Sequence, residues 1–125
     1  MRVTMLGCGP SWGVPRIGDD WGACDPADPR NRRRRVSILV EDGGSPLLVD
    51  TSPDLRQQLL DAEIRRVAAV LFTHAHADHL HGIDDLRSVN RMMQKALPIY
   101  ADPKTLVAGA AFGRLGDLMG FLDGV

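Results

Sequence analysis

Every histidine of this 125-residue chain lies in one short segment, THAHADHLHG, at residues 73–82. The segment holds four imidazoles and one carboxylate, those of His74, His76, His79, His81 and Asp78. Neutral imidazole and carboxylate are ligands that suit Zn²⁺, Mn²⁺ or Fe²⁺. The absence of a nearby cysteine disfavours a thiolate site. The segment therefore predicts a metal site of nitrogen and oxygen ligands.

The spacing of these residues predicts two ligand pairs. His74 and His76 are two positions apart at the end of a predicted strand, so their side chains leave on the same face and suit one ion. Asp78 and His79 fall where the chain turns into a helix, so they face a second position nearby. The alternative is a solvated histidine-rich tract. It is disfavoured because the segment lies between a buried strand and a capped helix.

Strands and helices are expected around this segment, from periodicity and turn signals. Residues 7–35 are dense in Gly, Pro and Asp and predict a long loop, which in compact domains is usually functional. Ser52 is expected to cap the first helix, with Pro53 at its first position. The expected strands are residues 1–8, 36–41, 46–52, 66–74 and 97–102, and the expected helices are residues 52–64, 82–96 and 102–115.

The composition fits a single domain over residues 1–125, because 44% of the residues are apolar and can form a core. The 15 basic and 16 acidic side chains nearly balance, so net charge favours neither nucleic acid nor an anionic membrane as partner. No apolar run approaches the roughly 20 residues that cross a bilayer. Without a signal peptide pattern or a disulfide framework of cysteines, we expect a cytoplasmic protein with no membrane partner.

The stretch AAVLFTHAHADHLHGIDDLR resembles the HxHxDH motif of the metallo-β-lactamase superfamily of metal-dependent hydrolases. The resemblance implies an α/β (α+β) fold, the αββα sandwich, of which this chain matches only the N-terminal half. It implies two divalent metal ions, zinc first and manganese as the alternative. His74 and His76 would bind one ion, and the catalytic residues Asp78 and His79 the other. A hydroxide between the ions would be the nucleophile.

Two further residues are candidates for contacts to the metal ligands. Asp50, in LLVDTSPD, resembles the aspartate that ends the strand before the motif in this superfamily, where it orients a ligand or braces the loop. A turn or capping role is the alternative for Asp50. His81 matches no ligand position of the motif. It is expected either as a polar residue at a helix start or as a contact to a ligand or to the substrate.

The opening LGCGPSWGVPRIG and the later DLR resemble the branch of phosphoribosyl 1,2-cyclic phosphate phosphodiesterases. The same clan includes the tRNA 3′-processing endonucleases, and the resemblance covers roughly residues 1–101. It implies a small cyclic or nucleotide-like phosphodiester as substrate, with no requirement for nucleic acid. Arg33, Arg34 and Arg35 are candidate substrate ligands, because a guanidinium matches phosphate oxygens. A solvated basic loop is the alternative.

After His81 the chain has no histidine, whereas the superfamily site takes two more histidines and a bridging aspartate. A catalytic zinc usually has three protein ligands, and here each ion would have two. We therefore expect an incomplete domain with an exposed apolar face. One hypothesis is a phosphodiesterase completed by a second copy or by another chain. The others are a non-catalytic half-domain, a hydrolase of thioesters or other esters, and a nuclease.

Overall fold

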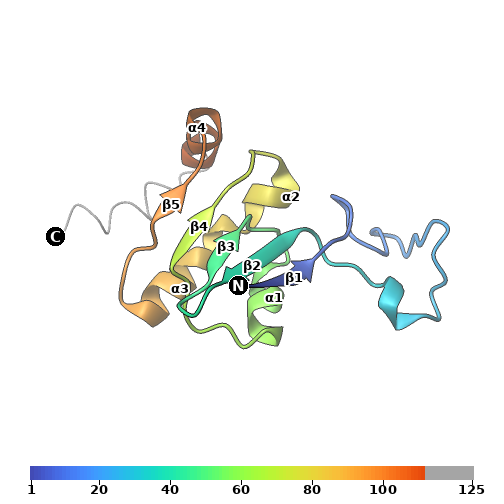
Figure 1. Ribbon diagram of the computed structural model, residues 1–125. Coiled ribbons are helices and arrows are strands. Elements are labelled where there is room, and N and C mark those ends of the chain that lie inside the picture. The colour runs from blue at the N-terminus through green and yellow to red at the C-terminus, as the bar shows by residue number, and fades with distance from the viewer. Residues whose placement is uncertain (112–125) are drawn as a thin grey trace.

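A mixed five-stranded sheet runs through the computed structural model, which describes residues 1–111 (Figure 1). Each strand pairs with the next one in the chain. Strands β1 to β3 are antiparallel, and β4 and β5 run parallel to β3. The strands are β1 (Arg2–Gly7), β2 (Ser37–Glu41), β3 (Leu47–Val49), β4 (Ala69–Leu71) and β5 (Ile99–Tyr100).

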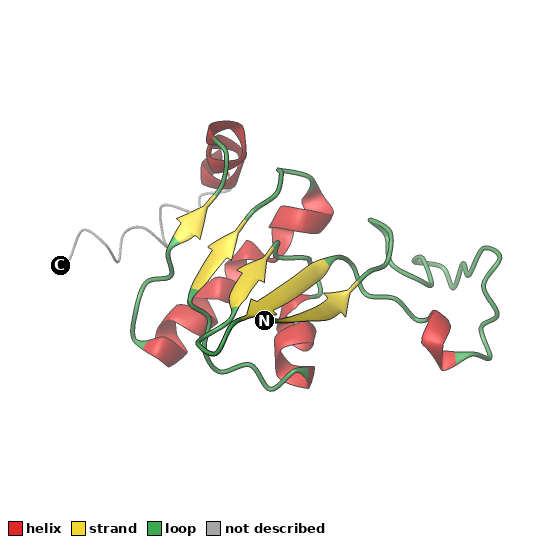
Figure 2. Cartoon of the chain, viewed as in Figure 1, coloured by secondary structure: helices red, strands yellow, loops and turns green. Residues whose placement is uncertain are grey.

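The helices are short and two of them cover one face of the sheet. Figure 2 shows α1 and α3 together on that face, while residues 8–36 extend from the end of the sheet as a long loop. The loop is the one that the glycines and prolines predict. The helical elements are η1 (Pro29–Asn31), α1 (Leu55–Asp61), α2 (Ala77–Leu80), η2 (His81–Asp85), α3 (Leu86–Met93) and α4 (Pro103–Ala111), where η denotes a 3-10 helix.

The core forms between the sheet and helices α1 and α3. The strand register aligns Leu39, Leu48 and Val70 in one row across β2, β3 and β4, and each is at most 1% exposed. Leu55 on α1 and Leu86 on α3 are completely buried against this row. The helices therefore stabilise the sheet by burying apolar surface, at about 25 cal/mol per Å² removed from water.

The opposite face of the sheet is also apolar. Successive side chains of a strand alternate between the two faces of the sheet. The residues just before and after Leu39, Leu48 and Val70 therefore point away from the helices. Val3, Met5 and Tyr100 on this face are more than half exposed. The register aligns two rows: Met5, Ile38, Val49, Leu71 and Tyr100, and Val3, Val40, Leu47 and Ala69.

The α+β class is confirmed, but the expected boundaries need corrections. The strand expected at residues 66–74 is only Ala69–Leu71, because β4 pairs with β3 over three residues. The helix expected from Ser52 begins at Leu55. Ser52 is not its cap: the hydroxyl donates to Gln58 Oε1 at 2.9 Å and accepts from the N–H of Asp54 at 3.1 Å.

The two later helices also differ in part from their patterns. The helix expected at residues 82–96 is divided into η2 and α3, and α3 ends where Gln94 takes a left-handed conformation with φ of 52°. α4 begins at Pro103 as expected, and Asp102 accepts a hydrogen bond from the N–H of Lys104 at 2.9 Å. The rest of that predicted helix lies outside the described residues. No helix formed by residues 1–111 has both the length and the apolar character needed to cross a bilayer.

Candidate functional site

The histidine segment runs from the loop after β4 through α2 to the start of η2 (Figure 1). β4 ends at Leu71, so His74 and His76 lie in the loop beyond the strand rather than at its end. Their rings nevertheless meet, with centroids 4.5 Å apart, and the His74 and His79 centroids are 3.9 Å apart. α2 begins directly after His76 and brings His79 back toward the loop.

Two pairs of donor atoms converge in this cluster. Nε2 of His74 is 3.0 Å from Nδ1 of His76, and Nε2 of His79 is 3.5 Å from Oδ2 of Asp78. Two ligands of one tetrahedral zinc, at bonds of about 2.0–2.1 Å, are roughly 3.3–3.4 Å apart. Both separations are close to that value, so the donor set suits one divalent ion at each pair. In the part of the chain that the structure describes, no three His, Cys, Asp or Glu side chains form a group that would hold a metal.

Asp50 joins the end of β3 to the histidine segment. It directly follows β3, adopts a left-handed φ of 61°, and is 3% exposed. Its carboxylate accepts three hydrogen bonds. Oδ1 accepts from the N–H of Thr73 at 2.8 Å, and Oδ2 from the Thr73 hydroxyl and from Nδ1 of His79, both at 2.7 Å. These contacts orient the His79 ring and brace the loop at Thr73, while a role of Asp50 beside a metal ligand stays a prediction.

The hydrogen bond to Asp50 also determines which nitrogen of His79 is available. A carboxylate only accepts, so Nδ1 of His79 must carry the hydrogen. Nε2 of the neutral ring then carries the lone pair, and this is the atom that faces Asp78. Carboxylates that hold a metal-binding histidine in this way are common in metal sites.

Backbone contacts behind α2 hold the segment in place. The N–H of Thr51 donates to the carbonyl of His79 at 2.7 Å, and the N–H of Gly82 donates to the carbonyl of Thr51 at 2.9 Å. A Cβ atom at Gly82 would lie 1.9 Å from the carbonyl oxygen of Ser52. Sequence reasoning missed Thr51 and Thr73, since their partners Leu80 and Asp50 lie 29 and 23 positions away in the chain and leave no local signal.

The remaining sequence candidates lie outside the donor cluster. His81 is exposed at the junction of α2 and η2. Arg34 pairs with Asp61 on α1 at 2.7 Å, and Arg33 lies 3.6 Å from the sulfur of Cys8. These two arginines thus contact other parts of the chain, and their expected role as substrate ligands stays a prediction.

Arg35 forms a bidentate ion pair with Asp54. Nε and Nη2 of Arg35 donate to the carboxylate at 2.9 and 2.7 Å, and the Arg35 N–H donates at 2.8 Å. The hydrogen bond from the Arg35 side chain is the main cause that lowers the pKa of Asp54 below its usual value. The same bond raises the pKa of Arg35, and the charge of Asp78 raises it further. The ion pair therefore lies within electrostatic reach of the histidine cluster.

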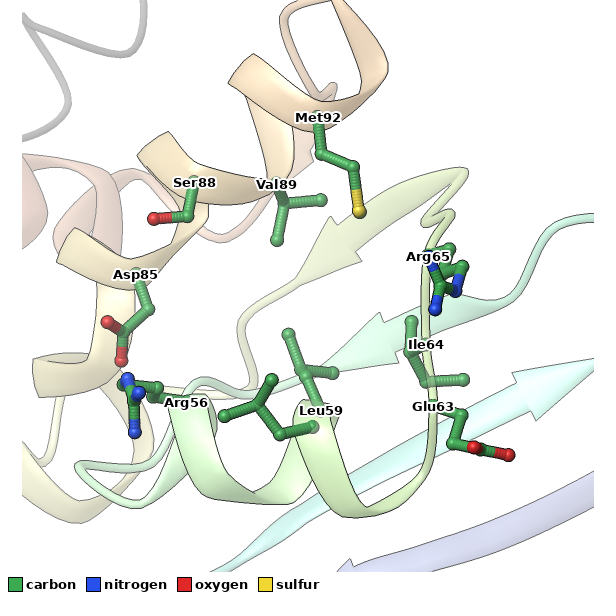
Figure 3. A pocket seen from close by; sticks show the side chains of 10 residues that line it. Arg56, Leu59, Glu63, Ile64, Arg65, Asp85, Ser88, Val89 and Met92 are labelled. Carbon is green, nitrogen blue, oxygen red and sulfur yellow. The ribbon is translucent and has the colours of Figure 1, made fainter.

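A separate groove of about 460 Å³ lies between α1 and α3 (Figure 3). Leu59, Val89 and Met92 contribute apolar side chains to it, and Arg56 and Asp85 are among its charged residues. Burial raises the pKa of the Asp85 carboxyl. None of the four histidines lines this groove, so it is distinct from the donor cluster.

The chain matches one protein family model and is similar to several solved structures. Residues 46–115 match the family model described as a beta-lactamase superfamily domain. The chain superposes on a crystal structure of a diphosphatase from the PhnP family with a TM-score of 0.81 and 42% identity, covering 88% of this chain. It also superposes on Zn²⁺-bound PqqB from Methylobacterium extorquens with a TM-score of 0.70 and 30% identity, covering 95% of this chain.

Two curated relatives complete the comparison. An octanoyltransferase of Porphyromonas gingivalis is 43% identical over 107 residues, which cover 85% of this chain and 21% of the relative. A ribonuclease Z of Bradyrhizobium sp. is 35% identical over 82 residues, which cover 62% of this chain and 27% of the relative. The chain also spans 45% of the diphosphatase and 42% of PqqB, so it matches less than half the length of each of these proteins.

Proposed function

We propose, from the premise that this chain belongs to the beta-lactamase superfamily, that it forms the metal-binding part of a hydrolase of phosphodiester-like bonds. The convergence of His74 Nε2 with His76 Nδ1, and of His79 Nε2 with Asp78, supports the proposal. These four residues would hold two divalent ions. Zinc is the first candidate, as in the PqqB structure, and manganese is the alternative.

Each of these residues would have a separate role in binding metal. His74 and His76 would hold one ion, while Asp78 and His79 would hold the other at the catalytic centre. Asp50 keeps a hydrogen on Nδ1 of His79 and so leaves Nε2 available. Bound divalent ions lower the pKa of a coordinated water and offset negative charge on phosphoryl oxygens.

A small phosphodiester or diphosphate is favoured over RNA as substrate. The diphosphatase is 42% identical to the chain, whereas the ribonuclease Z is 35% identical over 82 residues. Three arginines of the basic run pair with carboxylates of the chain, which lowers the net positive charge available to RNA: Arg30 with Asp28, Arg34 with Asp61 and Arg35 with Asp54. Arg32 lies over the ring of Trp21, and Arg33 lies beside the sulfur of Cys8.

Completion by further polypeptide is the second part of the proposal. Each donor pair supplies two ligands, while a catalytic zinc usually has three from protein. The two apolar rows on the open face of the sheet also favour cover by protein. Further polypeptide would supply both the missing ligands and the cover.

Zinc binding and hydrolysis by the 125-residue chain test the proposal. We expect elemental analysis and calorimetric titration to find one to two equivalents of zinc. We also expect the loaded chain to hydrolyse bis(p-nitrophenyl) phosphate faster than a thioester. The variants His76→Ala and Asp78→Asn should weaken zinc binding, while Asp42→Asn, at an exposed turn, should not. If the chain binds zinc but does not hydrolyse the phosphodiester, it is a metal-binding module. If it does not bind zinc, the non-catalytic half-domain is favoured.

A further inference from the structure

Thr73 contacts three groups of the histidine cluster at once. Its hydroxyl oxygen is 2.7 Å from Asp50 Oδ2, 2.9 Å from Nδ1 of His74 and 3.4 Å from Nδ1 of His79. We propose that Thr73 is a positioning residue that sets the tautomer of His74, acting as a relay from the buried carboxylate of Asp50. This inference rests on the proposed metal-binding function of His74.

The number of hydrogens on each group decides which of them donates. A threonine hydroxyl carries one hydrogen and can donate one bond, while a carboxylate can only accept. The separation of 2.7 Å between the hydroxyl and Asp50 is typical of an O–H···O bond. Thr73 therefore donates to Asp50, and its oxygen is left to accept from His74. Nδ1 of His74 must then carry a hydrogen.

The opposite arrangement is unfavourable. If the hydroxyl donated to His74, the oxygen of Thr73 would face Oδ2 of Asp50 at 2.7 Å with no hydrogen between them. Two acceptors at that distance repel each other, and the repulsion is strong where the carboxylate is 4% exposed and poorly screened. The backbone N–H of Thr73 also donates to Oδ1 of Asp50 at 2.8 Å, which keeps the side chain beside the carboxylate.

The tautomer of His74 determines whether its Nε2 atom can bind a metal ion. With the hydrogen on Nδ1, the lone pair of neutral His74 lies on Nε2, which accepts a hydrogen bond from Nδ1 of His76 at 3.0 Å in the metal-free chain. Asp50 sets the tautomer of His79 directly and that of His74 through Thr73. One buried carboxylate thus prepares a nitrogen donor in each of the two pairs before any ion arrives.

The tautomer can be read directly in the metal-free chain. Long-range ¹H–¹⁵N correlation spectra of the ¹⁵N-labelled protein distinguish a hydrogen on Nδ1 from one on Nε2 for each histidine. We expect His74 to be the Nδ1–H tautomer in the wild type and in Thr73→Ser, which keeps the hydroxyl. In Thr73→Val, which keeps the shape but not the hydroxyl, we expect the Nε2–H form to appear. Persistence of the Nδ1–H form in Thr73→Val would overturn the inference.

Zinc affinity gives a second readout on the same three proteins. Loss of a contact that orients a ligand typically lowers metal affinity about 10- to 100-fold, and we expect that loss in Thr73→Val and recovery in Thr73→Ser. Equal affinities for all three proteins would contradict the relay, and thermal unfolding would show that each variant is folded. If none of the three binds zinc, the proposed function fails, while the spectra of the metal-free chain still decide the inference.

Discussion

Asp50 and His79 are 29 positions apart in the chain, yet a hydrogen bond of 2.7 Å joins the carboxylate to Nδ1 of the imidazole. The contact follows from the parallel pairing of β3 with β4, which brings the carboxyl ends of both strands to the same edge of the sheet. Asp50 follows the first of these strands, and the loop after the second leads into α2 and His79. The sheet therefore positions the carboxylate for the histidine.

Replacing Asp50 with asparagine should weaken both the fold and the metal site. The carboxylate accepts three hydrogen bonds, and an amide has a single oxygen, so at least one donor would face an NH₂ group. We expect Asp50→Asn to lower the free energy of unfolding by about 1–3 kcal/mol. We also expect zinc affinity about 10- to 100-fold lower, measured by competition with a chromophoric chelator.

The control for this change is Asp42→Asn. Asp42 is an exposed carboxylate that pairs with the amino terminus of the chain. Its replacement should therefore leave zinc affinity at the wild-type level. An Asp50→Asn variant with wild-type stability and affinity would show that the three hydrogen bonds contribute little.

Gly82 should not tolerate a side chain. The methyl group of alanine would lie 1.9 Å from the carbonyl oxygen of Ser52, and the other nearest atoms are also backbone atoms of residues 51 and 52, which cannot rotate away as a side chain could. We expect Gly82→Ala to destabilise the chain by about 2 kcal/mol or more, measured by chemical denaturation. Gly44→Ala is the matched control, because nothing lies within 4 Å of its added Cβ. A similar loss in both variants would argue against the close packing of η2 on residues 51–52.

The ion pair between Asp54 and Arg35 should make stability depend on pH. Arg35 lowers the pKa of Asp54 in the folded state, so the pair contributes fully above the unfolded pKa of about 3.9. That contribution is lost as the pH falls through the lower, folded pKa. We expect Asp54→Asn to be less stable than the wild type at pH 7, with the difference shrinking below about pH 4. A difference that stays constant from pH 7 to pH 2.5 in urea titrations would contradict this assignment.

Neighbouring leucines on β3 should differ in their contribution to stability. Leu48 faces the helices and is completely buried, whereas Leu47 is half-buried on the open face. We expect Leu48→Ala to lower the free energy of unfolding by about 2–5 kcal/mol, and Leu47→Ala by roughly 1 kcal/mol. Equal losses in the two variants, measured by urea denaturation of the isolated chain, would show that the open face is covered by protein in solution.

Local patterns predict much of this fold but not its exact extents. The alternation and turn chemistry of residues 36–52 predict β2 and β3, and Asp102 with Pro103 predicts the start of α4. The length of β4 could not be predicted, because it depends on how many residues pair with β3 and β5. For the same reason the expected strand-end position of His74 was wrong: the paired strand stops at Leu71.

The candidate site was also predicted only in part from the sequence. Residue types and spacing predict the four donors, since imidazoles and a carboxylate at these intervals are rarely grouped without a ligand. Thr73 could not be recognised from sequence, because its partner Asp50 lies 23 positions earlier in the chain. The acidic partners of Arg34 and Arg35, on or beside α1, could not be found from sequence because they lie 27 and 19 positions away.

The order of strands in the sheet has a consequence for how the chain is made. Because each strand pairs with its successor, every strand after β1 meets a partner that has already been synthesised when it leaves the ribosome. β3, α1, β4 and α2 follow one another between residues 47 and 80, and these elements with the loops that join them carry Asp50, Thr73 and the four donors. The donor cluster can therefore assemble early in translation, before β5 and α4 exist.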